Sequence, residues 1–275
     1  SQLWEPKNFD GKFEGPMRMR TALVKSKNLV SIRILQAIGI QYAQDYITRF
    51  GFDSSRHPPY LPMALGSGSV TPMQMAVGYS VFANGGYRIA PYFIKRIEDE
   101  KGNVLEQFQP ITPLNGAKRV IDPRNAFIMT HMMQDVVNYG TAAKAKQLGR
   151  TDLAGKTGTT SNFVDAWFCG FQKDLVTVAW TGYDEPKSLG NNETGGRIAL
   201  PIWMDYMGPV LKGVPMAEYK PPNGILATKI DSATGFRESA GDINEYFFSE
   251  QLPPVSDTVV DHTPKVTKDL KDQLF

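Results

Sequence analysis

Two apolar runs separated by a short polar turn constrain the fold of this chain more than any other feature. Residues 163–171 read Phe-Val-Asp-Ala-Trp-Phe-Cys-Gly-Phe, a short run rich in aromatic residues, and residues 175–181 read Leu-Val-Thr-Val-Ala-Trp-Thr. The turn between them is Gln172-Lys173-Asp174. Aromatic and β-branched runs joined in this way predict an antiparallel hairpin. Residues 155–160, which precede the hairpin, are predicted to form a third strand beside it.

This third strand is also the predicted edge of a binding site. Its sequence, Gly-Lys-Thr-Gly-Thr-Thr, presents an ammonium group, hydroxyls and bare backbone N–H groups. Such a surface suits an anionic, extended, peptide-like ligand. A phosphate-binding loop is disfavoured, because that motif needs Gly where Arg150 stands and should open a helix. The remaining alternative is a solvated turn rich in Gly and Thr.

Helical periodicity predicts helices in the sequence both before and after the strands. The predicted helices cover residues 16–39, 42–50, 71–83, 124–138 and 198–210. Ser26-Lys27-Asn28 interrupts the first of them, and because Ser and Asn compete with the helical backbone for hydrogen bonds, we expect a loop there. Residues 92–108 are predicted to form a peripheral hairpin, residues 142–152 a mobile basic connector and residues 191–197 a polar loop.

These elements predict an α/β fold in which a helical cluster packs on an antiparallel sheet. Residues 1–213 are expected to form the main domain. Residues 214–255 have little helical or strand periodicity and are expected to form an irregular appendage. Residues 256–275 are polar and are expected to be a disordered tail.

Composition excludes several classes of function. The chain has 30 basic and 28 acidic residues spread along it, so it lacks the basic footprint of a nucleic-acid-binding protein. No apolar run approaches the roughly 20 residues that cross a bilayer. The single cysteine, Cys169, lies in an aromatic run and is predicted to be a small core residue. The histidines lack metal-ligand spacing, so we expect neither a metal nor a cofactor.

Two short motifs, Ser26-x-Asn28 and Lys156-Thr157-Gly158, resemble the second and third motifs of the penicilloyl-serine transferases. Further blocks carry the resemblance over roughly residues 1–213. They are Trp4-x-Pro6-x-Asn8-x-Asp10-Gly11-x-Phe13, Arg20-Thr21-Ala22-Leu23, Ala64-Leu65-Gly66-Ser67-Gly68, Thr71-Pro72-Met73-Gln74-Met75-Ala76, Phe82-Ala83-Asn84-Gly85-Gly86, Gly140-Thr141-Ala142 and Asp165-Ala166-Trp167-Phe168. Together they resemble the transpeptidase domain of class A penicillin-binding proteins.

This resemblance implies a serine β-lactamase-like fold and a function in the bacterial cell wall. It implies a D,D-transpeptidase that cross-links peptidoglycan stem peptides through an acyl-enzyme and is a target of β-lactams. The implied partners are stem peptides ending in D-Ala-D-Ala, β-lactam antibiotics and an N-terminal part of the same protein that carries a glycosyltransferase. The implied location is the periplasmic face of the bacterial inner membrane, with the anchor outside this chain.

The resemblance also implies roles for six residues. Ser26 would relay a proton, Lys156 would keep the local potential positive, and Asn28 would orient the amide of the substrate. Thr157 and Thr159 would hold the terminal carboxylate of the substrate beside Gly158, and the Thr159 N–H would supply half of an oxyanion hole. The motif leaves the identity of Lys27 open, so Lys27 is expected to tolerate substitution.

One departure limits what the chain can do alone. The nucleophile of the family is the Ser of a Ser-x-x-Lys motif, and no Ser of this chain has Lys three residues later. We interpret the chain as the carboxyl-terminal portion of a transpeptidase. A catalytically inert β-lactam sensor or scaffold is the alternative, whereas a β-lactamase or D,D-carboxypeptidase is disfavoured by residues 4–13 and the long tail.

The absence of a Ser-x-x-Lys motif predicts that the isolated 275-residue chain forms no covalent adduct with a labelled penicillin. Intact-mass measurement after incubation with an excess of the penicillin checks this. A stoichiometric mass increase of one acyl group would contradict the interpretation.

Overall fold

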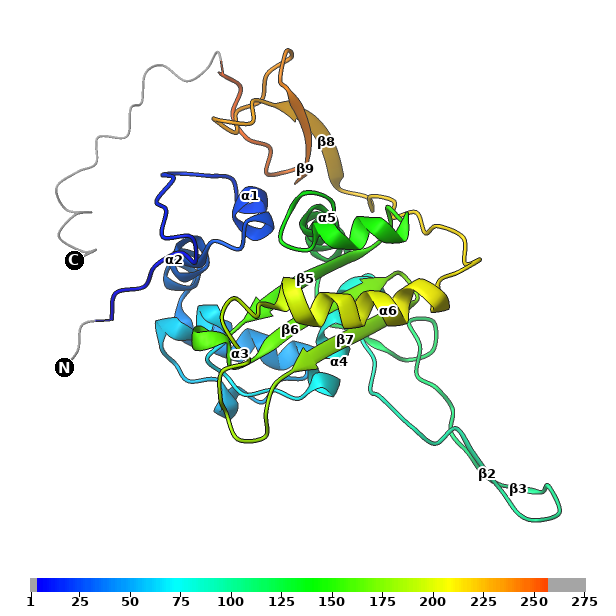
Figure 1. The fold of residues 1–275 in the computed structure, drawn as a ribbon. Coiled ribbons are helices and arrows are strands. Elements are labelled where there is room, and N and C mark those ends of the chain that lie inside the picture. The colour runs from blue at the N-terminus through cyan, green and yellow to red at the C-terminus, as the bar shows by residue number, and fades with distance from the viewer. Residues whose placement is uncertain (1–3, 257–275) are drawn as a thin grey trace. The chain divides into compact units, whose positions relative to one another are not determined.

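The computed structural model describes residues 4–256, and the chain divides into two compact units, Ser1–Pro222 and Asn223–Phe275. The first unit holds all the motifs singled out above and is drawn with the second in Figure 1. Each unit is described by itself. The predicted boundary at residue 213 therefore lies nine residues before the observed one.

A three-stranded antiparallel sheet forms the centre of the first unit, as predicted. Its strands are β5 (Ala154–Thr159), β6 (Ala166–Gln172) and β7 (Leu175–Thr181), in that order. The register pairs Lys156 with Cys169 and Gly158 with Trp167. Because side chains alternate between faces, Lys156, Gly158, Trp167 and Cys169 share one face of the sheet.

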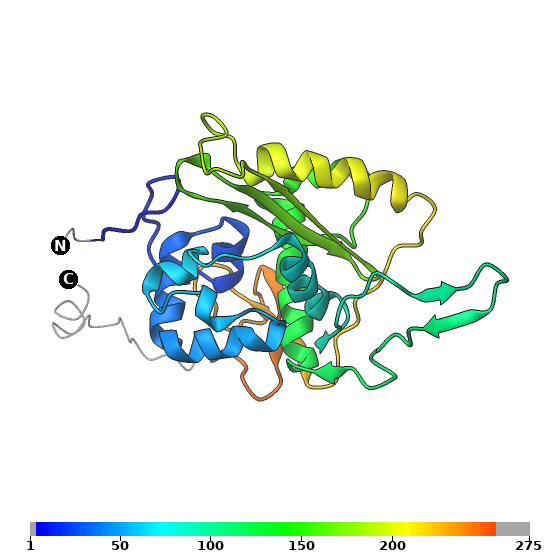
Figure 2. The ribbon, with the colours of Figure 1, turned by 90° about the horizontal axis from the view of Figure 1, so that it is seen from below.

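Helices cover both faces of this sheet (Figure 2). On the face opposite Lys156, α6 (Leu200–Val210) places Trp203 edge-on against Phe168, with ring centroids 5.0 Å apart. On the Lys156 face, α4 (Pro72–Ala83) and α5 (Pro123–Tyr139) pack Ala83 and Met133 against Phe171. The predicted arrangement of a helical cluster on an antiparallel sheet is confirmed.

The boundaries of the helices follow from local capping. Thr71 and Gln74 form a capping box at the start of α4, and Asp122 caps α5. The helix expected over residues 16–39 is divided into α1 (Met19–Val24) and α2 (Asn28–Ile38), with the break at the predicted Ser26 loop. Gly39, at φ 91°, separates α2 from α3 (Ile40–Ile47).

Short elements complete the first unit. Single helical turns cover Thr48–Phe50, Ser54–Arg56, Leu61–Leu65, Ala143–Leu148 and Ser161–Phe163. The strands β1 (Tyr87–Arg88) and β4 (Lys118–Arg119) pair with each other, as do β2 (Arg96–Glu98) and β3 (Val104–Gln107). The β2–β3 pair is the predicted peripheral hairpin, and it projects from the body of the unit (Figure 2).

Two segments expected to be irregular are ordered. Residues 142–152, predicted to be a mobile connector, contain the turn Ala143–Leu148, and the fully buried Ala142 and Ala145 fasten this segment to the core. Part of the polar loop predicted over residues 191–197 belongs to a π-helical turn, Gly195–Ala199, that leads into α6. The prediction for residues 142–152 was wrong, and the prediction for residues 191–197 holds for residues 191–194 but not for residues 195–197. In both segments polar composition concealed small residues that pack closely.

The second unit corrects a further prediction. Residues 214–255 are not irregular throughout, because β8 (Ile225–Ile230) and β9 (Ile243–Phe248) form an antiparallel hairpin. Asp231 and Asp242 hold the connection, accepting hydrogen bonds from backbone N–H groups at Thr234 and Ser232. The predicted disordered tail, residues 256–275, lies outside the described residues except for Ser256.

Candidate active site

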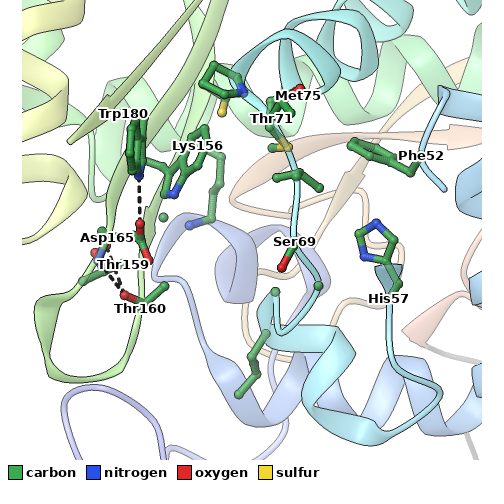
Figure 3. A pocket seen from close by; sticks show the side chains of 18 of the residues that line it. Phe52, His57, Ser69, Thr71, Met75, Lys156, Thr159, Thr160, Asp165 and Trp180 are labelled. Atoms are coloured by element: carbon green, nitrogen blue, oxygen red, sulfur yellow. Dashed lines mark hydrogen bonds between the residues drawn. The ribbon is translucent and has the colours of Figure 1, made fainter. Parts of the chain in front are cut away.

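A cavity of about 640 Å³ opens between the sheet and the helical cluster of the first unit. One wall is formed by β5 from Lys156 onward, together with Trp167, Cys169 and Trp180. The other wall contains Met75 and Tyr79 of α4 and the loops that carry His57 and Ser69 (Figure 3). The cavity therefore lies along the strand that the sequence predicted as the edge of a binding site.

Lys156 joins the two motifs that were predicted to act together. Its Nζ donates a hydrogen bond of 2.8 Å to Oγ of Ser26, which is 130 residues away in sequence, and a second of 3.0 Å to the Thr157 carbonyl oxygen. Ser26 lies in the turn between α1 and α2 with φ 54°, in the left-handed region that non-glycine residues rarely adopt. Such backbone strain persists only where the surroundings impose it, and it is typical of functional sites.

The ammonium group of Lys156 lies in a poorly solvated environment. Burial disfavours its charged form and lowers its pKa to about 8, from an ordinary value of 10.5. No carboxylate in the described part of the chain offsets this effect. Near neutral pH Lys156 therefore remains mostly charged and makes the local potential positive, which suits an anionic ligand.

Asn28, the second residue of the predicted serine motif, begins α2. One hydrogen of its Nδ2 is donated to the Lys7 carbonyl oxygen over 2.9 Å. The side-chain amide has a second donor hydrogen and an oxygen acceptor available for a ligand. Neither Ser26 nor Asn28 lines the cavity, and Ser26 contacts it through Lys156.

Lys27, between these two residues, is expected from the motif to tolerate substitution, but its surroundings give a reason to expect the opposite. Its side chain is only 3% exposed, and its Nζ lies 2.7 Å from Asp10 Oδ2 and 3.4 Å from Glu14 Oε1. The Ser-x-Asn motif accepts any residue in its middle position, so it does not indicate that Lys27 is buried and paired. Both partners of Lys27 come from a segment outside the motif.

The threonines of β5 are held by neighbours that the sequence did not assign to the site. The hydroxyls of Thr157 and Thr141 are 2.7 Å apart, and Thr159 Oγ1 accepts a hydrogen bond of 3.0 Å from the Gly195 N–H. Gly195 packs so closely that an added Cβ would meet the carbonyl oxygens of Trp167 and Gly158. Only glycine fits there without displacing the turn from the strand.

Further residues line the cavity that sequence reasoning missed as site residues. Trp180 Nε1 donates a hydrogen bond of 2.8 Å to Asp165 Oδ1, and the Asp165 N–H donates one of 2.7 Å to Thr160 Oγ1 (Figure 3). Asp165 and Thr141 did fall in blocks that carried the family resemblance, which was the available signal. His57 was predicted only to lie in a loop, and no feature of the sequence indicated that it lines the site.

Cys169 forms part of the cavity wall, but its thiol is not a candidate nucleophile. Cys169 is buried, as predicted, and burial raises the pKa of its thiol to about 12, so it stays protonated at neutral pH. Within residues 4–256, no group of three His, Cys, Asp or Glu side chains could hold a metal ion. Across the same residues no helix has the length and hydropathy needed to span a bilayer.

Comparison with known proteins places this geometry in a family. Residues 2–207 match the family described as the penicillin binding protein transpeptidase domain. The chain belongs to the penicillin-binding protein transpeptidase family. This result confirms the resemblance drawn from the motifs and the fold predicted from it.

Curated members of the family are considerably longer than this chain. Penicillin-binding protein 1A of Neisseria lactamica is 53% identical over 225 residues, which cover 82% of this chain and 28% of that protein. Penicillin-binding protein 1A of Pseudomonas aeruginosa is 42% identical over an alignment that covers 92% of this chain and 37% of that protein. The chain thus spans about a third of the length of these relatives.

Solved structures of the family share the fold. The crystal structure of penicillin-binding protein 1A from Haemophilus influenzae has a TM-score of 0.87 at 33% identity and matches 92% of this chain and 43% of that one. The PonA1 protein of Mycobacterium tuberculosis, in complex with penicillin V, has a TM-score of 0.65 at 24% identity. The match covers 79% of this chain and 62% of that one. The second comparison supports the fold alone.

The burial of Lys156 predicts an unusual titration for a lysine. In the 275-residue chain, competitive acetylation followed by mass spectrometry should give Lys156 a midpoint near pH 8. Because the depressed pKa means that the unfolded state binds more protons, Lys156 should make stability rise with pH between about 8 and 10.5. A midpoint near 10.5 for Lys156 would contradict the assignment.

Proposed function

We propose that this chain is part of a peptidoglycan D,D-transpeptidase that works through an acyl-enzyme and is inhibited by β-lactams. The observation that carries the proposal is the hydrogen bond between Lys156 Nζ and Ser26 Oγ. It joins two motifs that are separately weak and places them beside a cavity of suitable size. Membership in the transpeptidase family supports the same reaction.

The proposed reaction needs a serine that this sequence does not supply in the family motif. A serine hydroxyl from a segment outside this sequence would attack the carbonyl of the penultimate D-alanine. The bond to the terminal D-alanine would break, and the leaving amine would take a proton. An acceptor amine would then attack the ester, forming the cross-link and releasing the serine. The greater length of the relatives leaves room for such a segment.

Ser26 and Lys156 would serve the proton transfer. The Ser26 hydroxyl can accept a hydrogen bond from Lys156 and still donate its own proton, so it can relay a proton between the nucleophile side and the leaving amine. The charged Lys156 beside it would favour the neutral form of a nearby amine base. It would also attract the terminal carboxylate of the substrate.

Asn28 and the β5 strand would position the substrate. The hydroxyls of Thr157 and Thr159 each have one hydrogen to donate, and Thr159 already accepts from Gly195, which leaves its hydrogen for a carboxylate. The Thr159 N–H would supply half of an oxyanion hole, and Gly158 would allow the substrate backbone to approach the strand. The free donor and acceptor of Asn28 would pair with the substrate amide.

The wider context follows from the family. We propose that the full-length protein joins a glycosyltransferase to this transpeptidase, acts on stem peptides ending in D-Ala-D-Ala and works at the periplasmic face of the inner membrane. A catalytically inert β-lactam sensor is the alternative. The contact between Ser26 and Lys156 favours a protein that forms an acyl-enzyme over an inert scaffold, because a scaffold that is never acylated has no need of a proton relay.

Substitutions in the full-length protein separate the two roles in the serine motif. Ser26→Ala should slow acylation by penicillin about a hundredfold or more while leaving the dissociation constant of the initial complex nearly unchanged, because a proton relay acts in the transition state. Asn28→Ala should weaken initial binding and acylation together. Ser31→Ala, on the exposed side of α2, is the matched control and should behave as wild type.

Stopped-flow acylation with a reporter β-lactam measures both constants. Equal losses for Ser26→Ala and Asn28→Ala would mean that the loop matters only as a structural element. An unmodified protein that is never acylated would contradict the proposed function itself.

A further inference from the structure

The middle residue of the serine motif is one of the most buried charged side chains of the first unit. Lysine is almost never buried unless it is paired, and the 3% exposed side chain of Lys27 is paired twice. Its partners, Asp10 and Glu14, both lie in the amino-terminal segment Trp4–Glu14, which has no regular secondary structure of its own. The ion pairs therefore tie an irregular segment to the turn that carries Ser26.

Neutral hydrogen bonds tie the same segment to the residues that follow. Asn28 Nδ2 donates to the Lys7 carbonyl oxygen over 2.9 Å, and the Leu29 N–H donates to Asn8 Oδ1 over 3.1 Å. Asn8 is itself fixed by a bond of 2.7 Å to the Lys12 carbonyl oxygen. Three consecutive residues of the motif and α2 thus each bind the amino-terminal segment, which runs beside α2 at the start of the ribbon (Figure 1).

The turn that these contacts hold is strained at Ser26. A left-handed conformation costs a non-glycine residue on the order of 1 kcal/mol or more, so the turn needs external restraint to keep it. Within the turn, the Ser26 N–H bonds the Leu23 carbonyl oxygen and the Lys27 N–H bonds the Ala22 carbonyl oxygen. These bonds close the turn, but they do not fix its position relative to Lys156. That position depends on contacts with residues outside the turn.

Resting on the proposed function, we propose that Lys27 is a positioning residue for the transpeptidase reaction. Its ion pairs with Asp10 and Glu14 hold the α1–α2 turn so that Ser26 Oγ stays in hydrogen-bonding contact with Lys156 Nζ. The amino-terminal segment Trp4–Glu14 is thereby part of the apparatus that shapes the site, although it lines no part of the cavity.

The ion pair between Lys27 and Asp10 favours the charged forms of both side chains. The hydrogen bond from Lys27 lowers the pKa of Asp10 below its ordinary value, and the same bond raises the pKa of Lys27 above its own. Both shifts favour the charged forms of Asp10 and Lys27. Lys156, whose pKa burial lowers to about 8, titrates at a lower pH than an ordinary lysine, which makes it a reporter of the Ser26 contact.

Lys25 offers a matched control. Its Nζ contacts Glu14 Oε2 at 2.9 Å, but its side chain is 49% exposed and it lies on the other side of Ser26 in sequence. Lys25→Met removes the same charge from the same neighbourhood without releasing a buried group. Lys27→Arg keeps the charge and the ability to bind both carboxylates.

The test uses four variants of the full-length protein and two measurements. Lys27→Met should lower the first-order acylation rate constant by about tenfold or more, with the dissociation constant of the initial complex changed less than about twofold, because a displaced relay affects the transition state alone. Lys27→Arg should recover most of the rate, and Lys25→Met should match wild type. Asp10→Asn, which leaves Lys27 in place, should lower the rate in the same direction by a smaller factor.

The second measurement does not depend on catalysis. The bond from Lys156 to Ser26 favours the charged form of Lys156, so its loss in Lys27→Met should move the Lys156 acetylation midpoint to lower pH, while Lys25→Met leaves it unchanged. If Lys27→Met does not fold, Asp10→Asn should give a shift of the same sign.

Two outcomes would overturn the proposal. One is an acylation rate constant for Lys27→Met equal to that of Lys25→Met. The other is an unchanged Lys156 midpoint in Lys27→Met or, if that variant does not fold, in Asp10→Asn. A wild-type protein that is not acylated at all would instead count against the proposed function, and the Lys156 midpoint would still decide the role of Lys27.

Discussion

The hydrogen bond between Lys156 and Ser26 is the interaction on which the site depends. It links the sheet to the helical cluster, and it requires two unfavourable conditions at once. Lys156 must hold its charge where burial lowers its pKa to about 8, and Ser26 must adopt a left-handed backbone with φ 54°. Neither condition would persist in an isolated turn or strand, so the surrounding packing must impose both.

The sheet and the segments around it supply that packing. Phe168 and Trp203 fix one face of the sheet, while Gly195 approaches β5 closely enough to bond Thr159 and fix the end of the strand. On the helical side, Asp10 and Asn8 hold the start of α2. Each motif residue is thus restrained by a partner distant in sequence, which is the arrangement expected of a preorganised site.

Prediction from sequence succeeded where the signal was local. The hairpin of β6 and β7 follows from period-two alternation around a short turn, and the helix start at Thr71 follows from its capping residues. It failed where a contact spans the sequence. Lys27 gives no local sign of burial, and β8 and β9 are separated by residues 231–242, a connection too long to suggest a hairpin. Gly195 likewise reaches the site only through the fold.

A double-mutant cycle between Ser26 and Lys156 tests the central claim most directly. Acylation rate constants would be measured for Ser26→Ala, Lys156→Met and the double variant in the full-length protein. If the two residues act as one unit, removing either of them already removes their joint contribution. The account therefore predicts that the double variant is little slower than the slower single variant. Rate losses that multiply would show that the two residues act independently, and they would contradict the account.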